Sequence, residues 1–320
     1  MNYIASEVHE KHHIRKTNAQ KQAFLAWATS ELENEGYQTK IETAQTLFWK
    51  SNNLVVGDPD TAELVLTAHY DTPPVMPFPN IITPKNVLIY WLYQIFIVII
   101  LLTLANAAGF LLSFVVGGRL AFFATEMFLF GLLYMLMCGP ANKNNANDNT
   151  SGVSTLLHTA CTLPAELRPR VAFVFFDNEE KSLLGSGAFA KMHPKVKEET
   201  LLINFDCVGE GDHILIIPPK ALMGDEQMQT AFENAFLPTE KKNVEVCTKS
   251  VFYPSDQKHF KKGVAIAAFL RGPRVGLYLD KIHTAKDINY DHANIELLSA
   301  GISRLLSGGG FQQIAGAGPQ

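Results

Sequence analysis

Charged residues are scarce in this chain of 320 residues. Lysine, arginine, aspartate and glutamate together make up 18% of it, against about 25% in an ordinary soluble domain. The deficit is local, because no charged side chain occurs between Lys85 and Arg119. The sequence also lacks a basic run, and its net charge is -4. We therefore expect no nucleic acid among the partners of this protein.

Cysteine is scarce as well. The four cysteines, Cys138, Cys161, Cys207 and Cys247, are scattered and form no CxxC pair. This spacing argues against a disulfide framework and against a zinc ribbon, and it predicts reduced, buried thiols. The first 20 residues lack the apolar core of a secretory signal. We therefore expect the bulk of the protein to stay in the cytoplasm.

The charge-free stretch is strongly apolar. Val87–Leu104 reads VLIYWLYQIFIVIILLTL, and a second apolar run continues from Arg119 to Cys138, interrupted only by Glu126. Each run holds about 20 residues, enough to cross a bilayer as a helix. The sequence therefore predicts an inserted hydrophobic hairpin of two transmembrane helices. A helical hairpin buried in an oligomer or against the body is the alternative.

We place this insertion at residues 84–140, with residues 86–138 in contact with the membrane. Both ends of the insertion return to one side, where Lys85 and Lys143 lie, and only Arg119 lies near the tip. Positive charge is enriched on the cytoplasmic side of membrane proteins. We therefore expect a membrane-associated protein whose body is on the cytoplasmic side.

Outside the insertion, predicted helices and strands alternate. Apolar residues at helical spacing predict helices at Thr17–Glu35, Ser151–Cys161, Ser182–Met192, Glu226–Phe236, Ser255–Lys262 and Ile295–Leu306. Short apolar runs predict strands at Thr46–Trp49, Asn53–Val56, Glu63–Ala68, Val171–Phe176, Leu201–Phe205, His213–Ile217 and Ala265–Leu270. The alternation predicts an α/β fold with helices on both faces of a sheet. Residues 1–83 and 141–320 would form this single domain.

Histidine and acidic residues gather just past the predicted strands. His69 and Asp71 follow one strand, Glu179 and Glu180 follow another, and Asp206 follows a third. In an open α/β sheet, the carboxyl ends of the strands meet at one crevice where ligands bind. So many carboxylates in one place are costly unless cations neutralise them.

Two further residues complete this set, because Asp148 precedes a predicted helix and His283 ends the segment GLYLDKIH. Imidazole suits zinc, and carboxylate can bridge two ions. We therefore predict two divalent metal ions, zinc in preference, which polarise a carbonyl and generate hydroxide near neutral pH. One carboxylate must stay free of metal to carry the proton, and the adjacent pair Glu179 and Glu180 suits that division.

The motifs HYD, NDNTSG, NEE, FDCVG and IHT occur in this order. The set resembles the dizinc aminopeptidase family of metallopeptidases, peptidase family twenty-eight, whose relatives include bacterial leucyl aminopeptidase, glutamate carboxypeptidase and glutaminyl cyclase. The resemblance covers residues 16–71 and 142–306. It implies the zinc exopeptidase fold (phosphorylase/hydrolase-like), with a mixed, mainly parallel sheet sandwiched by helices. It also implies an exopeptidase that releases N-terminal residues from a peptide substrate.

Carried over residue by residue, the resemblance implies five metal ligands. Asp148 bridges both metals. His69 and Asp206 complete one metal site. Glu180 and His283 complete the other.

The same resemblance implies two catalytic residues. Glu179 takes a proton from the attacking water and later gives it to the leaving amine. Asp71 orients the ring of His69. Tyr253 is a weaker candidate, because it could donate a hydrogen bond to the tetrahedral oxyanion or serve only as a structural tyrosine.

Other functions remain open at this point. A carboxypeptidase or a glutaminyl-cyclase-like enzyme could use the same fold, and Arg271 and Arg274 could bind a substrate carboxylate. A catalytically inactive, membrane-anchored binding protein is a further alternative. The family has a short loop between the motifs of His69 and Asp148, whereas this chain carries the hydrophobic insertion there.

One zinc motif is interpreted as a coincidence. His9, Glu10 and His13 match HExxH. Too little chain precedes them to build a sheet that could hold the motif. We interpret this segment as the exposed start of the first helix.

Overall fold

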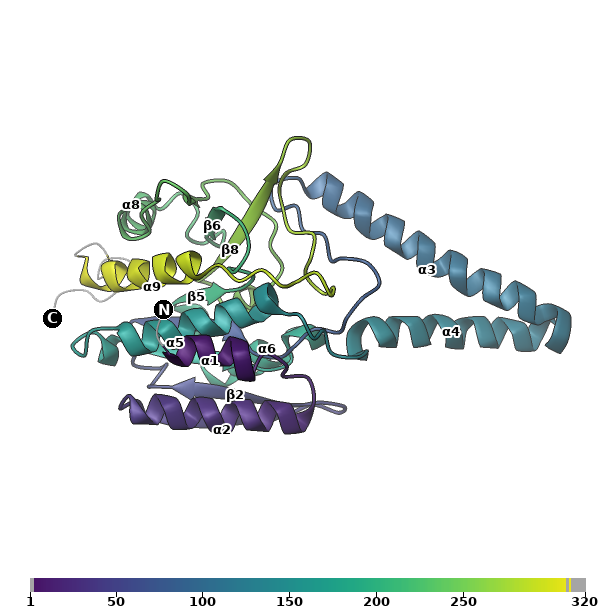
Figure 1. Ribbon diagram of the computed structural model, residues 1–320, viewed down its shortest axis with the longest axis horizontal. Coiled ribbons are helices and arrows are strands. Elements are labelled where there is room, and N and C mark those ends of the chain that lie inside the picture. Colours follow the sequence, from purple (N-terminus) through teal and green to yellow (C-terminus); the bar gives the residue numbers. More distant parts are fainter. Residues whose placement is uncertain (1–2, 309–310, 312–320) are drawn as a thin grey trace.

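One sheet forms the centre of the fold (Figure 1). The structure, a computed structural model, describes residues 3–308 and 311. Within these residues the strands are β1 (Thr39–Gln45), β2 (Lys50–Val56), β3 (Leu64–His69), β4 (Val171–Phe176), β5 (Leu201–Phe205), β6 (His213–Ile217), β7 (Asn243–Val246), β8 (Gly263–Gly272) and β9 (Gly276–Tyr278). Their order is β1-β2-β4-β3-β5-β8-β6-β7, and β9 pairs with β8.

The middle of the sheet is parallel. Strands β4, β3, β5 and β8 pair in parallel, whereas β1–β2, β2–β4, β6–β8 and β8–β9 are antiparallel. Every residue of β3, β4 and β5 is buried, as expected for strands covered on both faces. The register pairs His69 with Phe176 and Thr67 with Asn204. The carboxyl ends of three strands therefore meet at one edge.

Helices cover both faces of the sheet, as predicted. In the described residues they are α1 (Tyr3–Lys11), α2 (Asn18–Asn34), α5 (Gly152–Thr162), α6 (Leu184–Met192), α7 (Pro194–Glu198), α8 (Glu226–Ala235) and α9 (His292–Ser307). Apolar residues of α1, α2, α5, α8 and α9 share one buried core, and those of α6 and α7 share another. Short turns of helix are η1 (Ala146–Ser151), η2 (Arg168–Arg170), η3 (Glu179–Lys181) and η4 (Asp256–His259).

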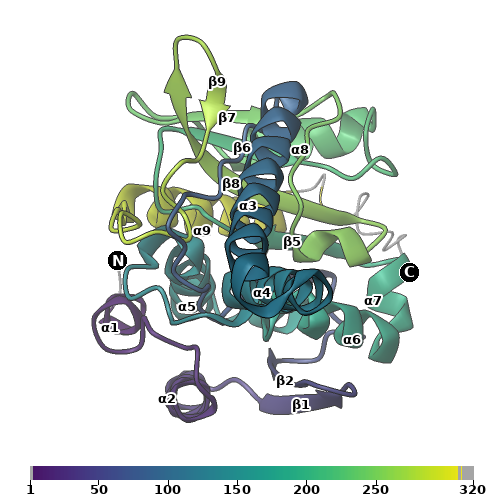
Figure 2. The same cartoon turned by 90° about the vertical axis from the view of Figure 1, so that its right-hand side faces the viewer.

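Two helices stand apart from the body (Figures 1 and 2). They are α3 (Val87–Val116) and α4 (Gly118–Cys138), which we call the helical hairpin. Both helices are long and apolar enough to cross a membrane. Figure 2, seen from their tip, shows both in front of the carboxyl edge of the sheet. The insertion is therefore attached beside the crevice predicted to bind ligands.

Most predicted elements are confirmed, and their ends follow local chemistry. Helix α2 begins after Thr17, whose hydroxyl accepts from the amide of Gln20 while the Gln20 side chain accepts from the amide of Thr17. The predicted strand at Thr46–Trp49 is wrong. The Thr46 amide donates to the Trp49 carbonyl at 2.8 Å, which closes a turn between β1 and β2.

The predicted helix at Ser255–Lys262 is also wrong. Only η4 forms there, because Lys258 donates to Ser255 and Phe260 donates to Gln257, three residues apart rather than four. Strands β1, β7 and β9 and helices α1 and α7 were not predicted as separate elements.

The N-terminal segment is not the exposed start of the first helix. It forms its own helix, α1, which ends at Lys11 before His13. The ring of His9 stacks on Tyr290 with ring centroids 4.3 Å apart. Arg15 is fully buried and donates to the carbonyl of Tyr70. The polar composition of this segment hid its packing, since the buried part includes a charged side chain held by main-chain carbonyls.

Candidate active site

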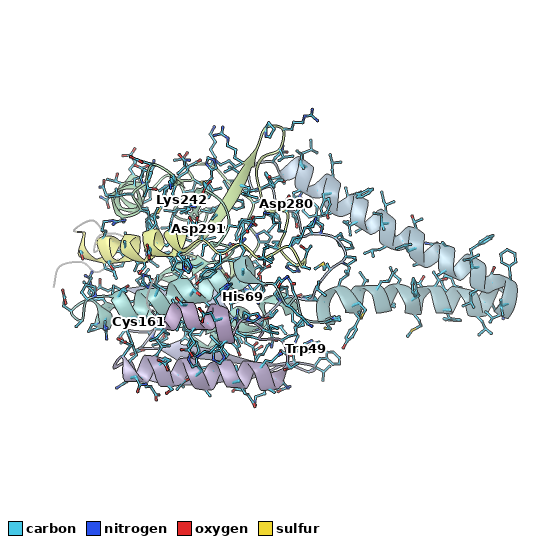
Figure 3. All side chains as sticks on the ribbon, in the orientation of Figure 1. Trp49, His69, Cys161, Lys242, Asp280 and Asp291 are labelled. Atoms are coloured by element: carbon cyan, nitrogen blue, oxygen red, sulfur yellow. The ribbon has the colours of Figure 1, made fainter. Side chains whose placement is uncertain are left out.

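The seven metal and catalytic residues implied by the sequence motifs lie together at the carboxyl edge of the sheet. They are His69 at the end of β3, Asp71 just after it, Asp148 in η1, Glu179 and Glu180 in η3 after β4, Asp206 after β5, and His283 in the loop after β9. All except Asp71 line one cavity of about 230 Å³. Figure 3 shows His69 in the interior of the body.

Asp148 stands between two histidines. Its Oδ1 is 3.3 Å from Nε2 of His69, and its Oδ2 is 3.2 Å from Nε2 of His283. Each histidine also approaches a second carboxylate. Nε2 of His69 is 3.7 Å from Oδ1 of Asp206, and Nε2 of His283 is 3.6 Å from Oε1 of Glu180. The side chains thus form two groups that share one carboxylate.

The donor atoms of these groups fit divalent cations. The ligand atoms of His69, Asp148 and Glu180 all lie within 4.8 Å of one another. Oε1 of Glu180 and Oδ1 of Asp206 are buried and have no hydrogen-bond partner among the residues that the structure describes. A buried carboxylate oxygen without a partner is costly. A metal ion coordinated by these imidazole nitrogens and carboxylate oxygens would remove that cost.

The electrostatics of the site demand positive charge. Burial, opposed by His283 and assisted by the neighbouring Asp148 carboxylate, raises the pKa of Glu180 to about 7. Burial likewise holds the pKa of Glu179 well above its ordinary value, and the charge of Glu180 adds to this. Burial opposes a charged His283, but Glu180 and Asp148 outweigh it and raise the pKa of that ring to about 9.

Backbone strain is concentrated around the same residues. Among the described non-glycine residues, those with positive φ are Asn178, Ser182, Leu183, Cys207 and His283, with φ between 55° and 66°. The first three flank Glu179 and Glu180, Cys207 follows Asp206, and His283 is itself a predicted ligand. Such conformations cost about 1–3 kcal/mol each and cluster at functional sites.

Asp71 supports more than the ring of His69. Nδ1 of His69 is 3.2 Å from the main-chain carbonyl oxygen of Asp71 and 3.6 Å from its Oδ1. Its carboxylate also accepts the amide of Glu179 at 2.9 Å and that of Glu180 at 3.3 Å. Burial opposes ionisation of Asp71, but His69 and Lys21 outweigh it and lower its pKa. Asp71 therefore joins the end of β3 to the turn after β4.

Asp287 is a functional residue that the sequence analysis missed. It is fully buried and accepts the amides of Asn147 at 2.8 Å and Asp148 at 3.0 Å. These two hydrogen bonds fix the backbone of Asn147 and Asp148. The position of Asp287, four residues after His283 in the motif HTAKD, was the only sequence feature that could have drawn attention to it.

The weaker candidates take different places. The hydroxyl of Tyr253 donates to the main-chain carbonyl of Asp206 at 3.0 Å, which favours the structural role over the oxyanion role. Tyr253 still lines the cavity. Arg271 and Arg274 are exposed residues of the β8–β9 hairpin and do not line it. Lys258 is the one lysine or arginine among the residues that line this cavity.

A family model describes more than half of the chain. The model of peptidase family M28 matches residues 133–303. The chain belongs to peptidase family M28. Membership confirms the resemblance drawn from the ordered motifs and supports a metal-dependent hydrolase of the peptidase type. A search of curated proteins finds no match to the chain.

Solved structures similar to this M28 chain share its fold at low identity. A Zn-dependent exopeptidase from Parabacteroides distasonis is 17% identical with a TM-score of 0.58, over 98% of this chain and 95% of that one. Glutaminyl cyclase from Porphyromonas gingivalis is 16% identical with a TM-score of 0.56, over 95% of both chains. The LapA aminopeptidase of Legionella pneumophila is 14% identical with a TM-score of 0.53, over 97% of this chain and 67% of that one. They confirm the predicted zinc exopeptidase fold.

Proposed function

We propose that this protein is an aminopeptidase that releases N-terminal residues from peptides with the help of two divalent metal ions, zinc in preference. The observation that carries the proposal is the position of Asp148, whose two oxygens face His69 and His283 separately. A shared carboxylate between two imidazole-carboxylate groups suits a pair of ions better than one.

In this proposal, each residue has a defined task. Asp148 would be shared by the two ions, His69 and Asp206 would hold one, and Glu180 and His283 would hold the other. When bound, the two ions polarise the scissile carbonyl and lower the pKa of the attacking water.

Glu179 is proposed as the general base and acid. It lines the cavity next to the ligand Glu180, and its main-chain amide is held by Asp71. Its carboxylate takes a proton from the attacking water and returns it to the leaving amine. Because Asp71 contacts both His69 and Glu179, it fixes the position of the proposed base relative to one proposed ligand.

The choice of an aminopeptidase over a carboxypeptidase is supported by the charges around the cavity. Within the described part of the chain, four acidic residues line it, namely Asp148, Glu179, Glu180 and Asp206, with a single lysine and no arginine. A carboxypeptidase needs a cationic pocket for the substrate's terminal carboxylate. A lining with one lysine does not form such a pocket, which supports cleavage at the amino end of the substrate.

The test is a substrate panel run on metal-reconstituted protein. Amino-acid p-nitroanilides should be hydrolysed, whereas N-blocked dipeptides and cyclisation of N-terminal glutamine peptides should show no turnover. Glu179→Gln should keep two bound metals and lose several orders of magnitude in turnover, because the proton carrier is gone. Near-normal turnover in that variant would refute the role of Glu179. Turnover of N-blocked dipeptides alone would refute the aminopeptidase assignment.

We also propose that the helical hairpin anchors the enzyme in a membrane, with the body on the cytoplasmic side. Only 22% of the most apolar window of α3, and 6% of that of α4, is buried. The exposed residues of α3 form a broad apolar face that includes Leu88, Trp91, Leu92, Ile95, Phe96, Val98 and Ile99, and the buried residues on its other side, Ile97, Leu101 and Ala105, are apolar too. A helix that is apolar all round suits lipid better than a protein partner.

The lengths of the two helices support this anchor. The 21 residues of α4 span about 31 Å at 1.5 Å per residue, close to the roughly 30 Å of a hydrocarbon core. Replacing Pro84–Pro140 with a short linker should release the enzyme from membranes washed with alkaline carbonate, which retain the full chain. A truncated protein that resisted this wash would refute the anchor.

A further inference from the structure

A second apolar surface lies on the body itself, at the turn between β1 and β2. Leu47 is 87% exposed and Phe48 is 79% exposed. Turns are normally built from polar residues and glycine, so two adjacent large apolar side chains in open solvent are unusual. Trp49 follows them and is partly exposed. We call residues 46–49 the apolar turn.

The apolar turn is held rigidly. The hydroxyl of Thr46 accepts the amide of Trp49 at 3.0 Å, and the amide of Thr46 donates to the carbonyl of Trp49 at 2.8 Å. Nζ of Lys181 lies 4.0 Å from the centre of the Trp49 ring. The contacts of Thr46 and Trp49 therefore fix the conformation of the turn and leave Leu47 and Phe48, between them, exposed.

The position of the apolar turn indicates what covers it. It points to the side of the body from which the helical hairpin projects, and Trp49 lies on that side in Figure 3 (see also Figure 1). Leucine, phenylalanine and tryptophan are the residues that enter the interface of a bilayer, and lysine suits the headgroup level. Lys50 is exposed directly beside the turn.

From these observations we infer that the apolar turn is a second membrane contact, in which Leu47, Phe48 and Trp49 enter the lipid interface beside the helical hairpin. The inference rests on the proposed membrane anchor. Its occupant is lipid, because the turn continues the surface that the anchor places against the bilayer.

This contact would tie the catalytic residues to the bilayer. Lys181, which packs on Trp49, belongs to η3 together with Glu179 and Glu180. Lys181 also donates to the side chain of Asn178 at 3.0 Å. The end of α4 contacts η3 as well. The short helix η3, which carries Glu179, therefore contacts both the apolar turn and the helical hairpin. These contacts hold the active site close to the membrane surface.

Tryptophan fluorescence tests the inference, because the chain has three tryptophans, Trp27, Trp49 and Trp91. Variants that keep one tryptophan each, with phenylalanine at the other two positions, are reconstituted in phosphatidylcholine vesicles with or without bromine on the acyl chains. Trp91, on α3, reports on the anchor. Trp27, which packs against the core of the body, is the matched control.

We expect brominated lipid to quench Trp49 and Trp91 at least several-fold more than Trp27, and aqueous iodide to lose access to Trp49. Equal quenching of Trp49 and Trp27, with Trp91 quenched, would overturn the second contact and leave the anchor intact. Shielding from iodide without quenching by brominated lipid would assign the turn to a protein partner or a second copy, which also overturns it. If Trp91 were not quenched, the anchor and the inference would both fail.

Substitution of the turn gives a second measurement. In the variant that keeps only Trp49, Leu47→Ser with Phe48→Ser should reduce the quenching to the level of Trp27. Leu237→Ser is the control, since this 47% exposed leucine follows α8 on the side away from the hairpin (Figure 1). Turnover of a soluble p-nitroanilide should stay unchanged in both. Unchanged quenching after the double substitution would refute lipid contact by Leu47 and Phe48.

Discussion

Asp287 allows a quantitative test of how the bridging carboxylate is held. Its side chain accepts two buried main-chain amides, from Asn147 at 2.8 Å and Asp148 at 3.0 Å. The substitution Asp287→Ala leaves both amides buried without a partner. Each unpaired group costs about 1–3 kcal/mol, so the two together should lower the free energy of unfolding by about 2–6 kcal/mol.

Metal affinity should fall with the stability of this segment. Burial and the charge of Asp148 raise the pKa of Asp287 to about 8. The fold therefore keeps Asp287 close to the Asp148 carboxylate, where it binds the amides of Asn147 and Asp148. Without it, Asp148 loses the constraint that aims its oxygens at both histidines. We expect about a 10–100-fold loss in metal affinity, the usual result of removing a group that orients a ligand.

The assay combines thermal unfolding with competition against a chelator for bound zinc. Asp291→Ala is a matched control, because Asp291 also accepts an amide, that of Ala293 at 2.9 Å at the start of α9, but lies outside the cavity. Its loss should cost about 1 kcal/mol as a helix cap, together with its ion pair to Lys242, which keeps Asp212 as a partner, and should leave metal affinity unchanged. If Asp287→Ala matched this control in both measurements, the proposed role of Asp287 would be refuted.

Three further predictions concern the site and the body. Asp71→Ala should lower zinc affinity about 10–100-fold, because the ring of His69 and the amides of η3 lose the carboxylate that lies between them; an unchanged zinc titration would contradict this. Removing divalent ions with a chelator should lower the unfolding midpoint, and zinc at 100 times its Kd should restore about 2.7 kcal/mol, as measured by thermal shift. Burial opposes ionisation of Glu42, but hydrogen bonds from His193 and Lys40 outweigh it and lower its pKa. The stability that Glu42 contributes is thus present above its ordinary pKa and lost as the pH falls through the lowered value. The advantage of the wild type over Glu42→Gln in thermal unfolding should therefore shrink below about pH 4.5, and a constant difference down to pH 3 would contradict this.

Local chemistry made much of the fold predictable. Strands β4, β5 and β6 lie where the sequence has short apolar runs. A strand that is buried on both faces consists of a nearly continuous run of apolar residues, and such a run can be recognised in the sequence. The predictions failed where hydrogen bonds between residues three apart override the apolar pattern. The apolar turn has strand-like residues, but hydrogen bonds across Thr46 and Trp49 close it.

The same distinction applies to the site. The order and residue types of the motifs were sufficient to select His69, Asp148, Glu179, Glu180, Asp206 and His283, because metal chemistry restricts which side chains can serve. Supporting groups carry no such restriction. Asp287 and Arg15 act through main-chain amides and carbonyls, and any buried acid or base in the right place could do the same.

The sequence by itself therefore determined the family, the candidate ligands and the two apolar helices, since each rests on residue type and spacing. Only the tertiary structure decided how these parts meet. It brought Asp148 between two histidines that are more than 200 residues apart in the chain. It also placed the apolar turn on the hairpin side of the body (Figure 1). The physical reason is that distances between remote residues depend on the packing of the whole sheet and its helices, which no local pattern records.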